Sequence, residues 1–225
     1  MSVKITWQYL LAFAALNMIL GELHEQAHIQ TGFLICGCYG ERDFNVWTTC
    51  ANCTNSNYSF LATVAGPLLS YLVYGFCTFQ LLRGKDVQLK KFYLAALFAM
   101  LPFARIFTGW MGGGDEKTVL VYLLGDTFSV TSLKIAAAVF VTAICLPPIW
   151  IAIQQLPLKK RWWYVLGFNI GPLIFGMLWQ RAFLNKLLAA GILEQPILAG
   201  TPLLIALHFV CMLFLLLRFR KALIG

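Results

Sequence analysis

Long apolar runs separated by short polar connections dominate the pattern of residues along the chain. Each run comes close to the roughly 20 residues that a helix needs to cross a bilayer, and backbone groups in lipid must find hydrogen bonds within their own segment. We therefore expect an all-α integral membrane protein with about six transmembrane helices and short loops. The expected spans are residues 6–29, 58–82, 92–108, 130–153, 163–180 and 197–217.

The composition supports this class of protein. Hydrophobic residues make up 60% of the 225 residues and charged residues only 12%, whereas charged residues are about a quarter of a typical soluble domain. The first apolar run is too long for the core of a signal peptide, so we expect it to be a retained helix. Residues 1–225 are expected to form a single polytopic membrane domain, with a core over about 15–130 and additional helices over 130–225.

The net charge of +8 predicts membrane topology and no nucleic-acid partner. Eleven of the 17 Lys and Arg residues lie in four basic stretches: Lys4, 83–91, 156–161 and 218–221. Only four lie in the alternate connections: 30–57, 109–129 and 181–196. Because cytoplasmic loops carry an excess of Lys and Arg, we expect both termini in the cytoplasm and the alternate connections on the outer side.

Four cysteines fall in the first outer connection, as C-x-C and then C-x-x-C: Cys36, Cys38, Cys50 and Cys53. An even number of cysteines outside the cytoplasm usually forms disulfides, so we expect two here. The alternative is a structural zinc ion held by the four thiolates, because C-x-x-C spacing also suits tetrahedral metal coordination.

The stretch "HEQAH", from His24 to His28, lies in the outer third of the first expected helix. Residues i and i+4 share one helix face, so both imidazoles can bind one ion. Glu25 is placed to accept a proton from water and pass it to a leaving amine. Since ionisable groups inside a span are costly and usually functional, the stretch predicts one catalytic Zn²⁺ with Glu25 as general base. The alternative is a polar helix end at the membrane interface, which leaves the spacing unexplained.

A catalytic zinc ion usually has three protein ligands, so a third must come from elsewhere. His208 lies about 10 Å deeper than His24 and is expected to be a hydrogen-bonded packing residue. The stretch "GWMGGGDEKT" at 109–118 is on the same side as the two histidines. We expect Asp115 to be the third ligand, with Glu116 and Asp126 as alternatives. The glycines before Asp115 allow close backbone approach and are expected beside the substrate: Gly112, Gly113 and Gly114.

The same segment also fits ordinary helix connections. Asp115 and Glu116 suit the first turn of the next helix, where carboxylates interact favourably with the helix dipole. Asp126 suits an N-cap for the helix expected over 130–153. Residues 117–124 are too few to cross the bilayer and are expected to be re-entrant.

The order of these features resembles the site-2 protease family of intramembrane zinc metalloproteases. The matching parts are the H-E-x-x-H motif, then "VAGPLLS" at 64–70, then an acidic residue after the third span. This resemblance covers about residues 15–116. It implies two histidines and a later aspartate as zinc ligands, the glutamate as general base, and Gly66 and Pro67 near the substrate cleft. The chain departs from the family at Ser70, where Asn is usual, and "GGGDE" only approximates the third motif.

The leading prediction is a membrane-embedded zinc metalloprotease that hydrolyses a peptide bond in or next to a membrane segment. Its partners would be membrane lipids and a membrane-protein or peptide substrate, with the metal site toward the extracytoplasmic side. A second interpretation is a non-catalytic structural or accessory subunit of a membrane complex. A third is a metal or proton transporter, which needs polar residues through the centre of the membrane. Its candidates are Asn17, Arg105, Lys134 and Asn169.

Overall fold

The computed structural model describes residue 1 and residues 3–225, with the backbone alone at residue 160. Five helical segments of the described chain are long and apolar enough to cross a membrane. These segments are Ser56–Arg83, Val87–Trp110, Val130–Gln154, Arg161–Ala189 and Leu203–Leu223. They coincide with the second to sixth expected spans, which supports the class of helical, multi-pass membrane protein. Two small β-hairpins depart from the all-α expectation.

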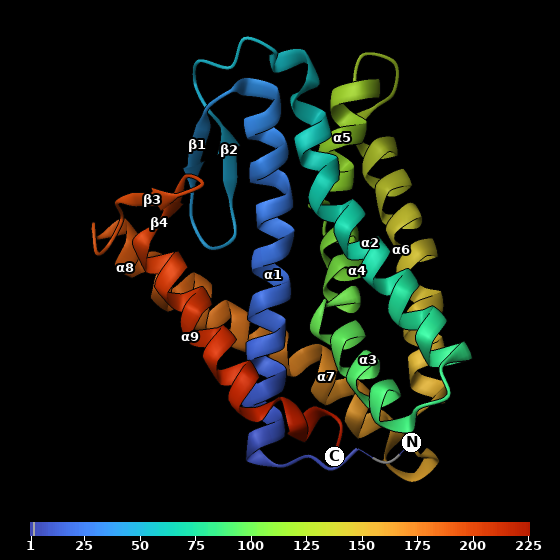
Figure 1. The fold of residues 1–225 in the computed structure, drawn as a ribbon. Coiled ribbons are helices and arrows are strands. Elements are labelled where there is room, and N and C mark those ends of the chain that lie inside the picture. Colours follow the sequence, from blue (N-terminus) through green and yellow to red (C-terminus); the bar gives the residue numbers. More distant parts are fainter. Residues whose placement is uncertain (2) are drawn as a thin grey trace.

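Helix α1 (Trp7–Cys36) is the long central element, against which α2 and α9 pack (Figure 1). Its 30 residues span about 45 Å at 1.5 Å per residue, so it is longer than the expected span of 6–29. It is not among the five most apolar segments because its outer half carries the polar residues of "GELHEQAH". It begins where the Thr6 side chain accepts a hydrogen bond from Tyr9 N, and ends at Gly37, whose φ is 72°.

A hairpin follows α1 and lies beside its outer half (Figure 1). Strand β1 (Tyr39–Arg42) pairs antiparallel with β2 (Trp47–Thr49). The two expected disulfides are confirmed in this connection, and they are nested: Cys36 with Cys53, and Cys38 with Cys50. A 3₁₀ turn (Ser56–Tyr58) then leads into α2 (Ser59–Arg83). The disulfides therefore tie the hairpin to the end of α1.

The third expected span is broken into α3 (Val87–Ala99) and α4 (Pro102–Trp110). Proline has no N–H to donate and its ring opposes the preceding helical turn, so a helix restarts more easily at Pro102 than it continues through it. Leu101 absorbs the change of direction with φ 56°, in the left-handed region.

Side chains from two other helices satisfy the carbonyl groups that this break leaves free. Asn17 Nδ2 donates to Ala99 O at 2.5 Å, and the Tyr74 hydroxyl donates to Met100 O at 2.8 Å. Because buried carbonyl groups need partners, these contacts stabilise the break. After the break, α4 and the polar part of α1 line the same cavity.

Helix α5 (Asp115–Leu124) is short and packs between α2 and α6 (Val130–Gln154). Asp115 and Glu116 occupy its first turn, as the dipole argument predicts. The prediction that Asp126 caps α6 is wrong. Ser129 is the N-cap, and its side chain accepts a hydrogen bond from Ser132 N, because the chain turns for three more residues before the helix starts.

The C-terminal third forms a second helical layer. After a 3₁₀ turn (Leu158–Lys160), its elements are α7 (Arg161–Gly176), a π-helical segment (Met177–Leu184), α8 (Asn185–Ala189), β3 (Pro196–Leu198), β4 (Thr201–Pro202), α9 (Leu203–Phe219) and a final 3₁₀ turn (Arg220–Leu223). The last span was expected to start at residue 197, but 197–202 forms the β3–β4 hairpin. Ala199 and Gly200 connect its strands with φ of 51° and 66°, as in a type I′ turn.

The hydrophobic core lies toward the end of the molecule that holds both chain termini (Figure 1). There α1, α3, α6 and α7 bury a cluster that includes Tyr9, Leu94, Phe98, Ala152 and Phe168. The β1–β2 hairpin and α5 lie in the opposite half of the molecule (Figure 1). The polar half of α1 therefore stands between α2, α5 and the hairpin, outside the main apolar core.

Candidate metal centre

The structure brings His24, His28 and Asp115 together from α1 and α5. The two Nε2 atoms are 3.1 Å apart, and Asp115 Oδ2 lies 3.6 Å from His24 Nε2 and 3.8 Å from His28 Nε2. One ligand atom from each residue lies within 4.8 Å of the others, and the structure forms no other such group among the described His, Cys, Asp and Glu residues. A motif five residues long and a turn almost 90 residues later thus meet at one point.

Helix α2 holds both imidazoles through one stripe of residues, Ala62, Gly66 and Ser70, spaced four apart. His28 Nδ1 lies 2.7 Å from Ala62 O, which can only accept, so Nδ1 carries the proton. His24 Nδ1 lies 2.9 Å from Ser70 Oγ, and the Ser70 hydroxyl donates to Gly66 O at 3.2 Å. Since that hydroxyl proton is used, Ser70 accepts from His24.

The hydrogen bonds to α2 therefore leave the Nε2 lone pair of each neutral imidazole facing the other. Asp115 adds a carboxylate oxygen to the same space. Three electron-rich atoms this close repel one another unless a cation lies between them, and that cation can be a proton or a metal ion. Ligand atoms about 2.0–2.1 Å from a tetrahedral zinc ion lie about 3.3 Å from each other. The three observed distances are 3.1, 3.6 and 3.8 Å, close to that separation.

A glycine turn delivers Asp115 to this point. Gly112 and Gly114 have φ of 78° and 93°, which residues with a side chain rarely adopt. Gly113 N donates to Thr108 O at 3.0 Å, which closes the C-terminus of α4. Burial raises the pKa of Asp115, but the contact with His24 and the nearby charges outweigh this effect, and its pKa lies below the ordinary value.

The two alternative carboxylates do not join the cluster. Glu116 Oε1 accepts from Arg105 Nη2 at 2.6 Å, and the Tyr71 hydroxyl also donates to it. These contacts commit the Glu116 carboxylate to Arg105 and Tyr71, and it is not part of the group of possible ligands. Asp126 is exposed in the turn before α6.

The remaining carboxylates of α1 separate into two environments. Glu22 forms a bidentate ion pair with Arg42 of β1, with N–O distances of 2.8 and 2.9 Å. Gln26 Nε2 donates to Glu22 Oε1 and to Thr201 Oγ1, both at 2.9 Å, so this face of α1 binds the two hairpins. Glu25 is half-buried, and no described residue forms a hydrogen bond or ion pair with its carboxylate. Glu25 is therefore the acidic side chain of this helix that is not committed to a structural contact.

Two cavities lie in this part of the molecule, and the first of them has His24 and Asp115 in its wall. One of about 240 Å³ extends toward the α3–α4 break and is lined by residues that include Asn17, His24, Ser70, Arg105 and Asp115. Another of about 520 Å³ lies between α2, α5 and α6; it is mostly apolar, and Pro67 and Glu116 are part of its wall.

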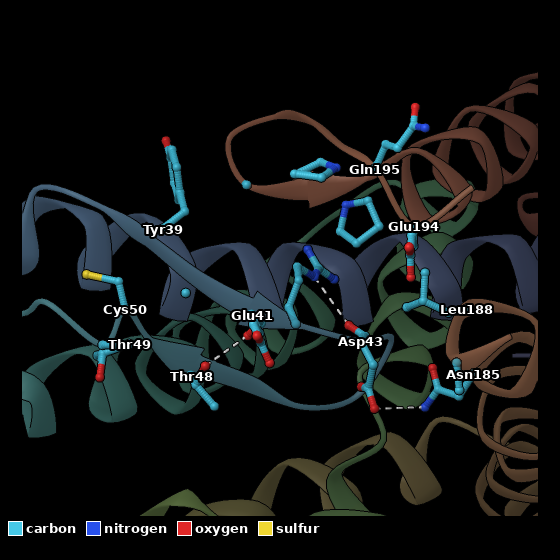
Figure 2. A pocket seen from close by; sticks show the side chains of 17 residues that line it. Tyr39, Glu41, Asp43, Thr48, Thr49, Cys50, Asn185, Leu188, Glu194 and Gln195 are labelled. Atoms are coloured by element: carbon cyan, nitrogen blue, oxygen red, sulfur yellow. Dashed lines mark hydrogen bonds between the residues drawn. The ribbon is translucent and has the colours of Figure 1, made fainter. Parts of the chain in front are cut away.

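A larger cavity, of about 1040 Å³, lies away from the cluster, between the two hairpins and α8 (Figure 2). Figure 2 shows Glu41, Asp43 and Glu194 in its wall, and Asn185 Nδ2 donates to Asp43 Oδ2 at 3.1 Å. Of its described lining residues, none belongs to the His24–His28–Asp115 group.

Several residues of the site were not singled out from the sequence for this role. The Trp47 ring stacks on His28 with centroids 4.9 Å apart, and Ser70 and Arg105 contact His24 and Asp115 directly. Arg105 carried a usable signal, because it is the one charged residue in the expected span 92–108, and such residues are usually functional. Ser70 stands where the family that the sequence resembles usually has Asn, whereas Trp47 carries no signal, since its role depends on packing.

The prediction that His208 is a hydrogen-bonded packing residue is confirmed. Trp179 Nε1 donates to His208 Nε2 at 3.1 Å, and the His208 ring packs against Phe44.

No protein-family model, curated protein or solved structure matches the chain. The function must therefore be argued from the geometry alone.

Proposed function

We propose that the protein is a membrane-embedded zinc metalloprotease, with His24, His28 and Asp115 as ligands of one Zn²⁺. The observation that carries this proposal is the convergence of two Nε2 lone pairs and a carboxylate oxygen at near-tetrahedral spacing. A proton between the histidines would relieve the repulsion of one pair of atoms, whereas a metal ion satisfies all three. Neutral imidazoles with the outer nitrogen hydrogen-bonded are the form in which histidine binds zinc.

Zinc, when bound, supplies a Lewis acid that polarises a carbonyl group and lowers the pKa of water. Glu25 takes up a proton from the attacking water and returns it to the nitrogen that leaves. Its lack of a structural partner supports this role, because a paired carboxylate would have to give up that partner to act as a base. Ser70 and Ala62 keep the imidazoles in the required tautomer.

The substrate in this proposal is a peptide bond in or next to a membrane segment. The cluster lies in the half of α1 near the disulfide-bonded hairpin, which we place outside the cytoplasm. The basic stretches at the opposite end of the molecule support that orientation, with both termini cytoplasmic. The apolar cavity along α2, which includes Pro67, would accept the hydrophobic part of the substrate.

The first test is the zinc content of purified protein in detergent. We expect about one zinc ion per chain in the wild type and in Glu25→Gln, and loss of zinc in His24→Ala and Asp115→Ala. Asp126→Asn is the matched control, because it removes an exposed carboxylate of the same region and should retain zinc. If folded wild-type protein contains no zinc and binds none when zinc is added, the proposal is contradicted.

The second test separates a protease from a structural metal site. Membranes containing the wild type or Glu25→Gln are compared by mass spectrometry for new peptide termini. We expect cleavage products in the wild type that are absent with Glu25→Gln, although both bind zinc. Identical termini in the two samples would leave the metal site without this catalytic role.

A further inference from the structure

Arg105 is a charged side chain in a membrane-spanning segment, and its position is set by the break between α3 and α4. Its side chain is 16% exposed. Nη2 lies 2.6 Å from Glu116 Oε1 and 3.4 Å from Asp115 Oδ2, and the guanidinium lies 5.6 Å from the centre of the Tyr71 ring. These contacts orient the guanidinium beside the proposed metal ligand.

The two carboxylates accept hydrogen bonds from only some of the N–H groups of the Arg105 guanidinium. A guanidinium has five N–H groups, and the contacts to Asp115 and Glu116 involve Nη2 alone. Nε is buried without a partner among the described residues, and none of them accepts a hydrogen bond from Nη1. Arg105 also lines the 240 Å³ cavity together with His24, Asn17 and Asp115. Arg105 therefore lines this cavity with donors that no described residue occupies, and Nη1 is the one that is not recorded as buried.

Charge balance favours an anion as that ligand. With a divalent ion bound, the ion and Arg105 carry more positive charge than Asp115 and Glu116 neutralise. Among these four charged groups, a single negative charge on a ligand oxygen restores neutrality, and charges in a partly desolvated site interact strongly.

We propose that Arg105 and the metal together form a binding site for a small oxyanion in the 240 Å³ cavity. The ligand class is a carboxylate, such as the new C-terminus of a cleaved peptide, or the negative oxygen that develops on a carbonyl group under attack. Nη1 donates a hydrogen bond to one ligand oxygen. This inference rests on the proposed function, because it requires the metal.

A purely structural interpretation assigns Arg105 only to neutralising Glu116 and Asp115. If Arg105 has only that role, its replacement should change folding and metal content. The replacement should not change how much more tightly the site binds an anion than a neutral molecule of the same shape. The comparison of acetate with acetamide separates the two roles, since only acetate carries the charge.

The test uses the full-length protein loaded with Co²⁺, whose visible absorption reports ligands at the metal. Wild type, Arg105→Gln and the control Lys134→Gln are titrated with acetate and with acetamide. Lys134 is exposed on α6 near the glycine turn, so its loss removes one positive charge without touching the cavity. We expect Arg105→Gln to weaken acetate binding about tenfold or more and acetamide binding less than twofold, since hydrogen bonds to charged groups are the stronger ones.

Different outcomes overturn different claims. Wild-type protein that binds no Co²⁺ refutes the proposed function and this inference with it. If Co²⁺ binds but Arg105→Gln leaves acetate affinity unchanged, or weakens it no more than Lys134→Gln, the inference alone is overturned. Should Arg105→Gln not fold, Arg105→Lys keeps a charge for Glu116 but loses the second guanidinium nitrogen. Acetate affinity equal to wild type in that variant refutes the inference as well.

Discussion

Replacing Ser70 by Ala isolates the contact that sets the orientation of His24. The hydroxyl accepts from His24 Nδ1 at 2.9 Å and donates to Gly66 O at 3.2 Å. Ser70 is 1% exposed, so bulk water has no ready path to replace the hydroxyl. Loss of a partner of this kind typically weakens metal binding 10–100-fold, or about 1.4–2.7 kcal/mol. We therefore expect Ser70→Ala to raise the zinc dissociation constant by that factor.

The assay is competition for zinc against a fluorescent chelator, with detergent-solubilised protein. Thr78→Val is the matched control on the same helix, because the Thr78 hydroxyl is buried without a partner among the described residues and its removal breaks no hydrogen bond. Thr78→Val should bind zinc like the wild type. A dissociation constant for Ser70→Ala within twofold of wild type would refute the argument that α2 selects the tautomer of His24.

Two further predictions concern packing around the site. A Cβ at Gly66 would overlap the imidazole of His28, so Gly66→Ala should reduce zinc content at least as strongly as Ser70→Ala. The control Gly75→Ala should retain zinc, because the space around Gly75 is open. Equal zinc content in Gly66→Ala and Gly75→Ala would contradict this prediction. Replacing Cys36 and Cys53 by Ser removes the outer of the two nested disulfides and should cost about 2–4 kcal/mol of stability, seen as a lower Tm in a thermal melt under oxidising conditions. An unchanged Tm would show that the hairpin does not depend on this disulfide.

The amino-acid sequence by itself determined the properties that depend on local pattern. Hydropathy alone located the five apolar segments, but not all of their ends: the segment expected over 163–180 extends to Ala189, and the one expected from 197 starts at Leu203 because a hairpin precedes it. Helical spacing alone placed His24 and His28 on one face, since i and i+4 always share a face. The two disulfides were predicted from the even number of cysteines in the first outer connection and from the expected position of that connection outside the cytoplasm. The glycines before Asp115 predicted a turn that other residues rarely form.

Tertiary structure decided the choices that depend on packing between distant segments. All three candidate ligands are carboxylates: Asp115, Glu116 and Asp126. The fold brings Asp115 to the histidines, whereas Arg105 and Tyr71 bind Glu116. Ser70 became a partner of His24 because α2 packs along α1 in one register. Such distances, between residues 46 to 91 positions apart in sequence, follow from how whole helices pack. Neither hydropathy nor spacing within one helix carries that information, because each describes a single segment before it meets its neighbours.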